Sequence, residues 1–149
     1  MACIERRTIT IEATPGAQSG EIDWRMISNG SPVPNEVISC SKSGTMKKDT
    51  DHHEVTFELK PSQGLKLSFL KDPDNVMWVQ PGTNCPKNPA ADRDFEIESV
   101  TDDRLVVRNY NRRKCDHKFT LNFLGKSPGE SDTRLIQYDP GWGNGNGGV

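Results

Sequence analysis

Hydrophobic and polar residues alternate with a period of two along much of the chain, most clearly within residues 94–123. Phe95 and Ile97 alternate with acidic residues, and beyond a Thr-Asp-Asp turn Leu105 and Val107 alternate with arginines. Successive side chains of a strand point to opposite faces of the sheet. The pattern therefore predicts half-buried antiparallel strands, each with one face on the core and one face in water.

The same alternation, bounded by Gly, Pro, Asn and Asp, predicts short strands elsewhere in the chain. These further segments are residues 8–12, 22–26, 36–41, 54–59, 65–69, 75–79 and 135–138. No segment places apolar residues at helical spacing over more than a turn or two. About eight strands separated by turns predict an all-β fold, an immunoglobulin-like antiparallel two-sheet sandwich.

The predicted core consists of the apolar residues that share one parity on each alternating strand. They are Ile9, Ile11, Ile22, Trp24, Val55, Phe57, Leu65, Leu67, Phe95, Ile97, Leu105, Val107, Phe119, Leu121 and Phe123. A slip of one residue in a strand would turn its whole apolar set toward water, so this parity also predicts the register.

We expect residues 1–138 to form a single β-sandwich domain and residues 139–149 to form a Gly- and Asn-rich C-terminal tail. The tail has high backbone freedom and little to bury, so its removal should leave the fold nearly intact. It is either a disordered end or an arm anchored by Trp142, which docks on its own sheet or on a neighbouring subunit. The strand before it ends at Tyr138.

Composition and charge indicate the number of domains, the partners that the chain is unsuited to and its cellular location. A chain of 149 residues with a net charge of −2 fits one domain and has no overall field that favours DNA or anionic membranes. No apolar run approaches the roughly 20 residues that span a bilayer, and the first residues lack the apolar centre of a signal peptide. We therefore expect a cytoplasmic protein, whose scattered cysteines remain free thiols.

The segment from Arg108 to Lys118 carries the one concentrated charge, with five basic residues, one acid and a tyrosine. Arg112, Arg113 and Lys114 at its centre could hold phosphates while Tyr110 stacks on a base. One such segment on a chain of net charge −2 is more typical of a solvated turn. Weak binding of an anionic ligand or nucleic acid here is the alternative interpretation, and we do not expect nucleic acid to be the partner.

No residue pattern predicts a metal site or a cofactor. His52 and His53 are adjacent, so on a strand they point to opposite faces. Cys115 and His117 are too close in sequence for a blue-copper site, and no methionine follows them. The chain also lacks the Gly-x-Ser-x-Gly and phosphate-loop motifs. We therefore predict that it is not an enzyme.

Three segments in the C-terminal part of the chain carry residue patterns that are typical of one protein family. Residues 101–111 read as a turn followed by Leu-x-Val-x-Asn-x-Asn, residues 119–123 as an aromatic–Thr strand, and Asp139-Pro140 precedes Asn144. Together they resemble the C-terminal half of the small bacterial proteins of the DP-EP family. The resemblance implies a bacterial, immunoglobulin-like sandwich of unknown role, and it transfers no catalytic residue.

The function that remains is a non-enzymatic interaction module or a self-associating accessory protein. The leading hypothesis is contact with a protein partner, or homo-oligomerisation, through a sheet face or the Trp142 arm. The candidate contact residues are Trp142, Tyr138, Arg112, Arg113 and Lys114.

Overall fold

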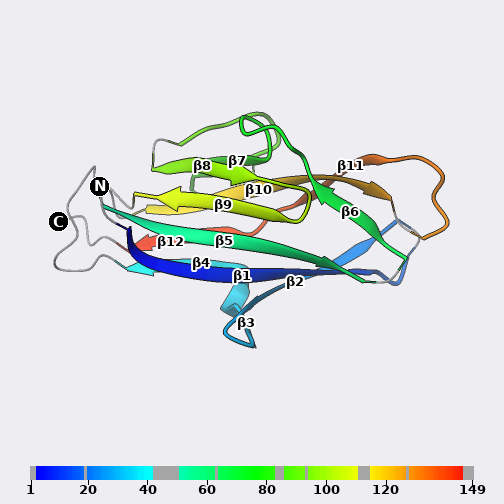
Figure 1. The fold of residues 1–149 in the computed structure, drawn as a ribbon, viewed down its shortest axis with the longest axis horizontal. Helices are drawn as coiled ribbons and strands as arrows, with labels where there is room; N and C mark the ends of the chain where they lie inside the picture. Colours follow the sequence, from blue (N-terminus) through cyan, green and yellow to red (C-terminus); the bar gives the residue numbers. More distant parts are fainter. Residues whose placement is uncertain are drawn as a thin grey trace.

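The computed structural model of the chain is an all-β sandwich of two sheets (Figure 1). The described residues are 3–18, 20–41, 51–62, 64–82, 86–92, 94–110, 115–126 and 128–145. Within these ranges the strands are β1 (Cys3–Pro15), β2 (Ile22–Ser28), β3 (Ser31–Pro32), β4 (Val37–Ser41), β5 (His52–Pro61), β6 (Lys66–Phe69), β7 (Met77–Pro81), β8 (Phe95–Val100), β9 (Arg104–Asn109), β10 (Cys115–Lys126), β11 (Arg134–Tyr138) and β12 (Gly141–Gly145). A short 3-10 turn, η1 (Pro34–Glu36), precedes β4.

The first sheet has the strand order β3-β2-β1-β5-β9-β8. The second has the order β11-β10-β12-β4, and β6 and β7 also pair with β10. β10 is long enough to pair with β6 and β11 toward its C-terminal end and with β7 and β12 toward its N-terminal end. The strands β7 and β8 therefore lie at the borders of different sheets, on the same side of the sandwich.

The predicted all-β sandwich is confirmed, with two differences. The described residues form more strands than the eight or so that the sequence predicts, because β12 carries no hydrophobic alternation and β3 spans only two residues. In addition, β1 pairs with β5 and β4 pairs with β12 in parallel. Side chains alternate with the same period in parallel and antiparallel strands, so the sequence pattern does not distinguish the two.

The predicted core is confirmed. Ten of its fifteen residues are buried, and the other five, Ile22, Trp24, Leu67, Phe95 and Ile97, are partly buried and pack against the buried cluster. Aromatic rings join the two sheets: Trp24 of β2 stacks on Phe123 of β10, with ring centroids 5.2 Å apart. Burying a large apolar side chain contributes about 1.5–3 kcal/mol, so this shared core is what holds the sheets together.

The sheet continues beyond the domain boundary that we predicted at residue 138. Gly141–Gly145 forms β12, which pairs antiparallel with β10 and parallel with β4. A Gly- and Asn-rich segment has few side chains to bury, but its backbone groups can form hydrogen bonds to a strand on either side. This part of the predicted tail therefore belongs to the fold, and residues 146–149 lie outside the described residues.

The described part of the chain contains no helix with the length and apolar character that crossing a membrane requires.

Candidate functional site

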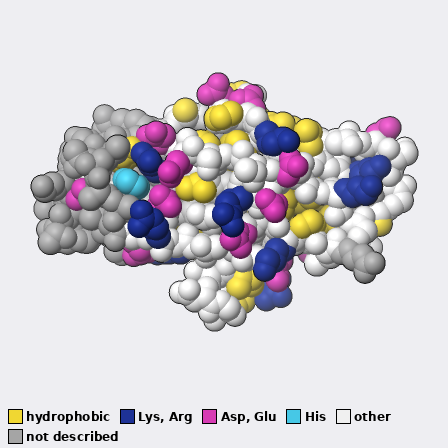
Figure 2. All heavy atoms as spheres, viewed as in Figure 1, with side chains coloured by type: hydrophobic (Ala, Val, Ile, Leu, Met, Phe, Trp, Pro, Cys, Tyr) yellow, Lys and Arg dark blue, Asp and Glu magenta, His cyan; other side chains and the backbone are white. Residues whose placement is uncertain are grey.

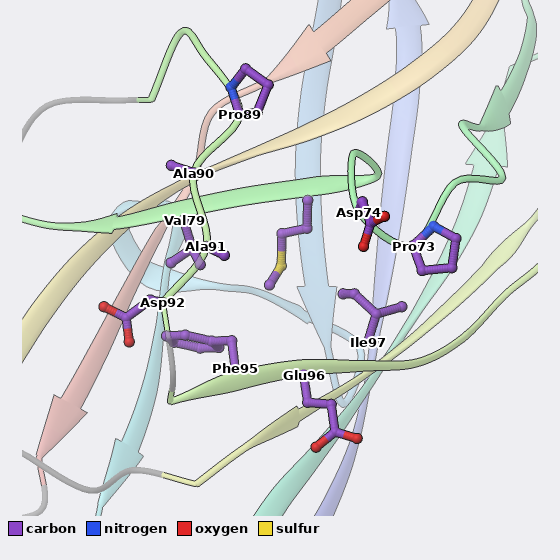
Figure 3. Close-up of a pocket in the computed structure, with 11 residues that line it drawn as sticks. Pro73, Asp74, Val79, Pro89, Ala90, Ala91, Asp92, Phe95, Glu96 and Ile97 are labelled. Carbon is purple, nitrogen blue, oxygen red and sulfur yellow. The ribbon is translucent and has the colours of Figure 1, made fainter.

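The sandwich has a cleft of about 470 Å³ between the border strands β7 and β8. Its apolar lining includes Met77 and Val79 from β7 and Phe95 and Ile97 from β8. Phe95 and Ile97 rise from the same side of β8, Phe95 below Val79 and Ile97 below Asp74, whereas Glu96 points to the other side (Figure 3). This is the pleat that the alternating sequence of β8 predicts.

The segment between β7 and β8 closes one side of the cleft and is tied to the second sheet. The backbone N–H of Val79 donates to the carbonyl oxygen of Ala90 at 3.1 Å. The hydroxyl of Thr120 on β10 donates to the carbonyl oxygen of Pro86 at 2.8 Å. These bonds hold residues 86–92 along β7, so among the described residues β8 is the border strand that remains beside the cleft.

The lining of the cleft carries only acidic charge among the described residues. Its charged residues are Asp74, Asp92 and Glu96, and it includes neither lysine nor arginine. The carboxylate of Glu96 accepts a hydrogen bond from the hydroxyl of Tyr110 at 2.9 Å, which orients it on the outer face of β8. Carboxylates around a cleft with apolar walls focus a negative potential there, and they attract cationic groups. Figure 2 shows basic and acidic side chains interspersed on one wide face of the sandwich.

Next to the cleft, Asp92 and Asp94 meet His117 of β10 in the interior. Each offers one ligand atom, and these three atoms lie within 4.8 Å of one another. The exposed fractions of Asp92, Asp94 and His117 are only 7%, 0% and 2%. Among the described residues, this is the group of His, Cys, Asp and Glu side chains that could hold a metal ion.

Local structure fixes the geometry of this cluster. The N–H of Asp94 donates to Oδ1 of Asp92 at 2.9 Å, so that Oδ2 of Asp92 faces His117. The N–H of Tyr110 donates to the carbonyl oxygen of Asp94 at 2.7 Å, which attaches the turn to β9. The ring of Phe95 meets the imidazole of His117 edge-on, with centroids 5.0 Å apart and planes at 83°. The carboxylate of Asp92, the backbone of Asp94 and the ring of His117 are therefore each held by a contact within the fold.

Two of the contact residues that the sequence suggested, Tyr138 and Trp142, lie within the strands of the sandwich. Tyr138 is buried in the core, and its hydroxyl donates to Glu36 at 2.6 Å. Trp142 lies within β12, with His117 and Ile38 as its Cα neighbours on the adjacent strands. Neither position is on a free arm.

The basic segment can be described only at its ends, because Arg112, Arg113 and Lys114 lie outside the described residues. Arg108 forms an ion pair with Glu98 at 3.3 Å, across β8 and β9. The hydrogen bond from Arg108 lowers the pKa of the Glu98 carboxyl, and Glu98 in turn raises the pKa of Arg108. Arg108, one cation of the predicted phosphate-binding segment, is thus already paired with a carboxylate of the same sheet.

Sequence reasoning did not identify the cleft or the carboxylates beside it. Asp92 and Asp94 lie at the end of a segment with prolines and no periodicity, far from His117 in the chain. The signal present in the sequence was the Asp-x-Asp spacing directly before an alternating strand, which brings two carboxylates into one turn. Only the folded arrangement shows that β10 brings a histidine to them.

The chain is an all-β sandwich with a cleft at one border, and the lining of this cleft combines apolar side chains with carboxylates. The chain matches no protein-family model, and no curated protein matches it significantly. The resemblance to the DP-EP family therefore remains a prediction.

Proposed function

We propose that the protein is a non-enzymatic interaction module, which binds an extended basic segment of a partner protein along β8 and in the adjoining cleft. The observation that carries the proposal is the lining of the cleft, in which the border strand β8 contributes two apolar side chains with one carboxylate between them, and Asp74 and Asp92 add acidic charge from neighbouring segments. Phe95 and Ile97 face the cleft, and Glu96 lies between them on the opposite face of β8.

The position of β8 supports strand addition. In the described part of the chain, β8 pairs with β9 alone. A border strand presents backbone N–H and C=O groups on its outer side, and an extended peptide can pair with them. The backbone groups supply affinity in this mode of recognition, and the alternating side chains supply specificity.

The pleat of β8 also predicts the pattern of the partner segment. Residues that lie opposite each other on neighbouring strands point to the same face of the sheet. Partner side chains beside Phe95 and Ile97 would enter the cleft and should be apolar, whereas those beside Glu96 should be basic. The partner is thus a segment in which apolar residues alternate with Lys or Arg.

This proposal keeps the class of function that the sequence predicts, a non-enzymatic interaction module. It places the contact on β8 and in the adjoining cleft instead of on the Trp142 arm. Self-association would use the same border if a second copy supplied the added strand, and it would appear as a mass that rises with protein concentration. The cytoplasmic location, the bacterial origin and the absence of enzymatic activity remain predictions. Binding of nucleic acid through Arg112, Arg113 and Lys114 also remains a prediction, and the described residues add no support for it.

The test uses two synthetic peptides, one with Lys and Val in strict alternation and one with Glu in place of Lys. Calorimetric titration of the full chain should show saturable binding of the Lys peptide and none of the Glu peptide. Asp74→Asn combined with Glu96→Gln should weaken the Lys peptide roughly 2- to 30-fold, because each exposed charge pair is worth about 0.2–1 kcal/mol. Both residues are exposed, so the fold should tolerate the changes.

A matched control removes two exposed carboxylates elsewhere, with Glu21→Gln and Asp132→Asn. This variant carries the same net charge and should bind the Lys peptide as the unmodified chain does. A steric variant, Ala91→Trp, should block the cleft from an exposed position in its lining. Equal losses in the cleft and control variants would show that only overall charge matters, and the proposal would then fail.

A further inference from the structure

We propose that Asp92, Asp94 and His117 form a binding site for a divalent transition-metal ion of the zinc class. The site is independent of the peptide-binding proposal, although Asp92 also borders the cleft. Two carboxylates and a neutral imidazole carry a formal charge of −2, which a divalent cation matches. The three ligands come from two separate segments, the turn before β8 and the strand β10.

The main evidence for a bound ion is the environment of His117. Its side chain is completely buried, and neither ring nitrogen forms a hydrogen bond with the described residues. Nε2 lies 3.3 Å from Oδ2 of Asp92, within ion-pair distance, but the two groups do not have the alignment of a hydrogen bond. Buried polar groups nearly always have a hydrogen-bond partner, and an exception calls for an explanation such as a bound ion.

The separation of these two atoms fits a shared ion. Nitrogen and oxygen ligands lie about 2.0–2.2 Å from zinc, so neighbouring ligands of a tetrahedral site are roughly 3.4 Å apart. Nε2 of His117 and Oδ2 of Asp92 already have almost this spacing, at 3.3 Å. The three ligand atoms all lie within 4.8 Å of one another, so Asp94 is near enough to be the third ligand.

The donor set selects the class of metal. Calcium and magnesium prefer ligand sets made of oxygen alone, so the imidazole disfavours them. A set of one imidazole and two carboxylates suits zinc and its first-row neighbours. Three protein ligands leave at least one position of a four-coordinate ion for water. Oδ1 of Asp92 accepts the N–H of Asp94, and this bond orients the ligating carboxylate as outer-shell bonds do in metal sites.

The competing interpretation is a simple buried ion pair, in which a protonated His117 faces Asp92. Both interpretations predict that His117 and Asp92 stabilise the fold. Only the metal site predicts saturable uptake of one ion per chain, dependence on Asp94, and an imidazole nitrogen that bonds to the metal.

The test starts with the full chain after removal of metals by a chelator. Titration with zinc chloride should saturate at one ion per chain and should raise the unfolding temperature, because an ion that binds only the folded state stabilises it. Asp94→Asn and His117→Gln should each weaken zinc binding at least tenfold. His52→Gln removes a buried imidazole outside the cluster and should bind zinc as the unmodified chain does.

Cobalt provides a second readout that does not depend on folding stability. The cobalt-loaded chain should show visible d–d bands without the near-ultraviolet band of a cobalt–thiolate bond, and Cys115→Ser should leave this spectrum unchanged. In nitrogen NMR of the zinc-loaded chain, one ring nitrogen of His117 should shift as a metal-bound imidazole does. Absence of saturable binding, unchanged affinity in Asp94→Asn, or a thiolate band lost in Cys115→Ser would each overturn the proposal.

Discussion

The indole of Trp24 on β2 stacks on the phenol ring of Tyr138 on β11, with centroids 4.8 Å apart and ring planes at 11°. The two residues belong to different sheets, so this stack is one of the contacts that close the sandwich. The hydroxyl of Tyr138 donates to Oε1 of Glu36 at 2.6 Å. Burial, together with this hydrogen bond to a carboxylate, raises the pKa of Tyr138 far above its ordinary value.

This raised pKa predicts how stability depends on alkaline pH. The folded-state pKa lies above the unfolded value of about 10, so the contribution of Tyr138 is complete below pH ~10 and is lost as the pH rises further. From this residue alone, the free energy of unfolding should fall by about 1.4 kcal/mol per pH unit above that point.

The measurement uses Tyr110→Phe, which leaves Tyr138 as the remaining tyrosine of the chain. In this variant the tyrosinate absorbance should appear only together with the change in tryptophan emission that reports unfolding. Tyrosinate formation near pH 10 with unchanged tryptophan emission would contradict the buried position of Tyr138.

Replacing Phe119 tests the core. Phe119 is fully buried on β10 and packs against Phe57 of the other sheet, with ring centroids 6.2 Å apart. Phe119→Ala should lower the free energy of unfolding by about 3–5 kcal/mol, which is a large part of the stability of a typical domain. Leu124→Ala on the same strand is the control, because Leu124 is 41% exposed and should cost less than ~1 kcal/mol. Similar losses in chemical denaturation of the two variants would show that the register of β10 is wrong.

Gly125 is required where β6 and β10 approach each other closely. A Cβ atom at this position would overlap the carbonyl oxygen of Lys66 and would lie 2.9 Å from Cδ1 of Leu67. Gly125→Ala should therefore lower the free energy of unfolding by about 1–3 kcal/mol, as overpacking commonly does. An unchanged midpoint in thermal unfolding would mean that β6 does not pair with β10 at this register.

Removing β12 should strongly destabilise the protein, contrary to what the Gly- and Asn-rich composition of this strand suggests. Deletion of residues 141–149 would leave β4 and the N-terminal end of β10 without their shared neighbour. Unpaired backbone groups in a sheet interior are costly, so cooperative unfolding should be lost or its midpoint should fall by roughly 10 °C or more. Deletion of residues 146–149 removes none of the described strands and serves as the control. Equal stability of the two truncated chains would restore the interpretation of residues 139–149 as a tail.

The parts of the fold that the sequence predicted are those in which a side-chain pattern has a direct structural meaning. Alternation in β9 placed Leu105 and Val107 in the core because a pleated strand with one buried face requires it. The same reasoning could not identify β12, where the pairing depends on the backbone and the side chains carry no pattern. The parallel pairing of β1 with β5 could not be predicted either, because parallel and antiparallel strands have the same period of alternating side chains and a similar composition.

The candidate sites were harder to predict for a different reason. Each depends on residues that are distant in the chain and meet only after folding, as His117 meets Asp92 and Asp94. The spacing of Cys115 and His117 argued against a metal, and it could not reveal ligands supplied by another segment. The cleft likewise exists because β7 and β8 border different sheets, and this is a property of topology.

Addition of a partner strand to β8 can be followed at a single backbone amide. The N–H of Tyr110 donates to the carbonyl of Asp94, and backbone groups alternate sides along a strand, so the N–H of Ile97 faces away from β9. Amide hydrogen exchange can be followed by NMR with and without the Lys–Val peptide. If β8 accepts an added strand, saturating peptide should slow exchange at Ile97 at least tenfold and leave the amides of the distant border strand β4 unchanged. Saturable binding with unchanged exchange at Ile97 would show that the peptide does not pair with β8.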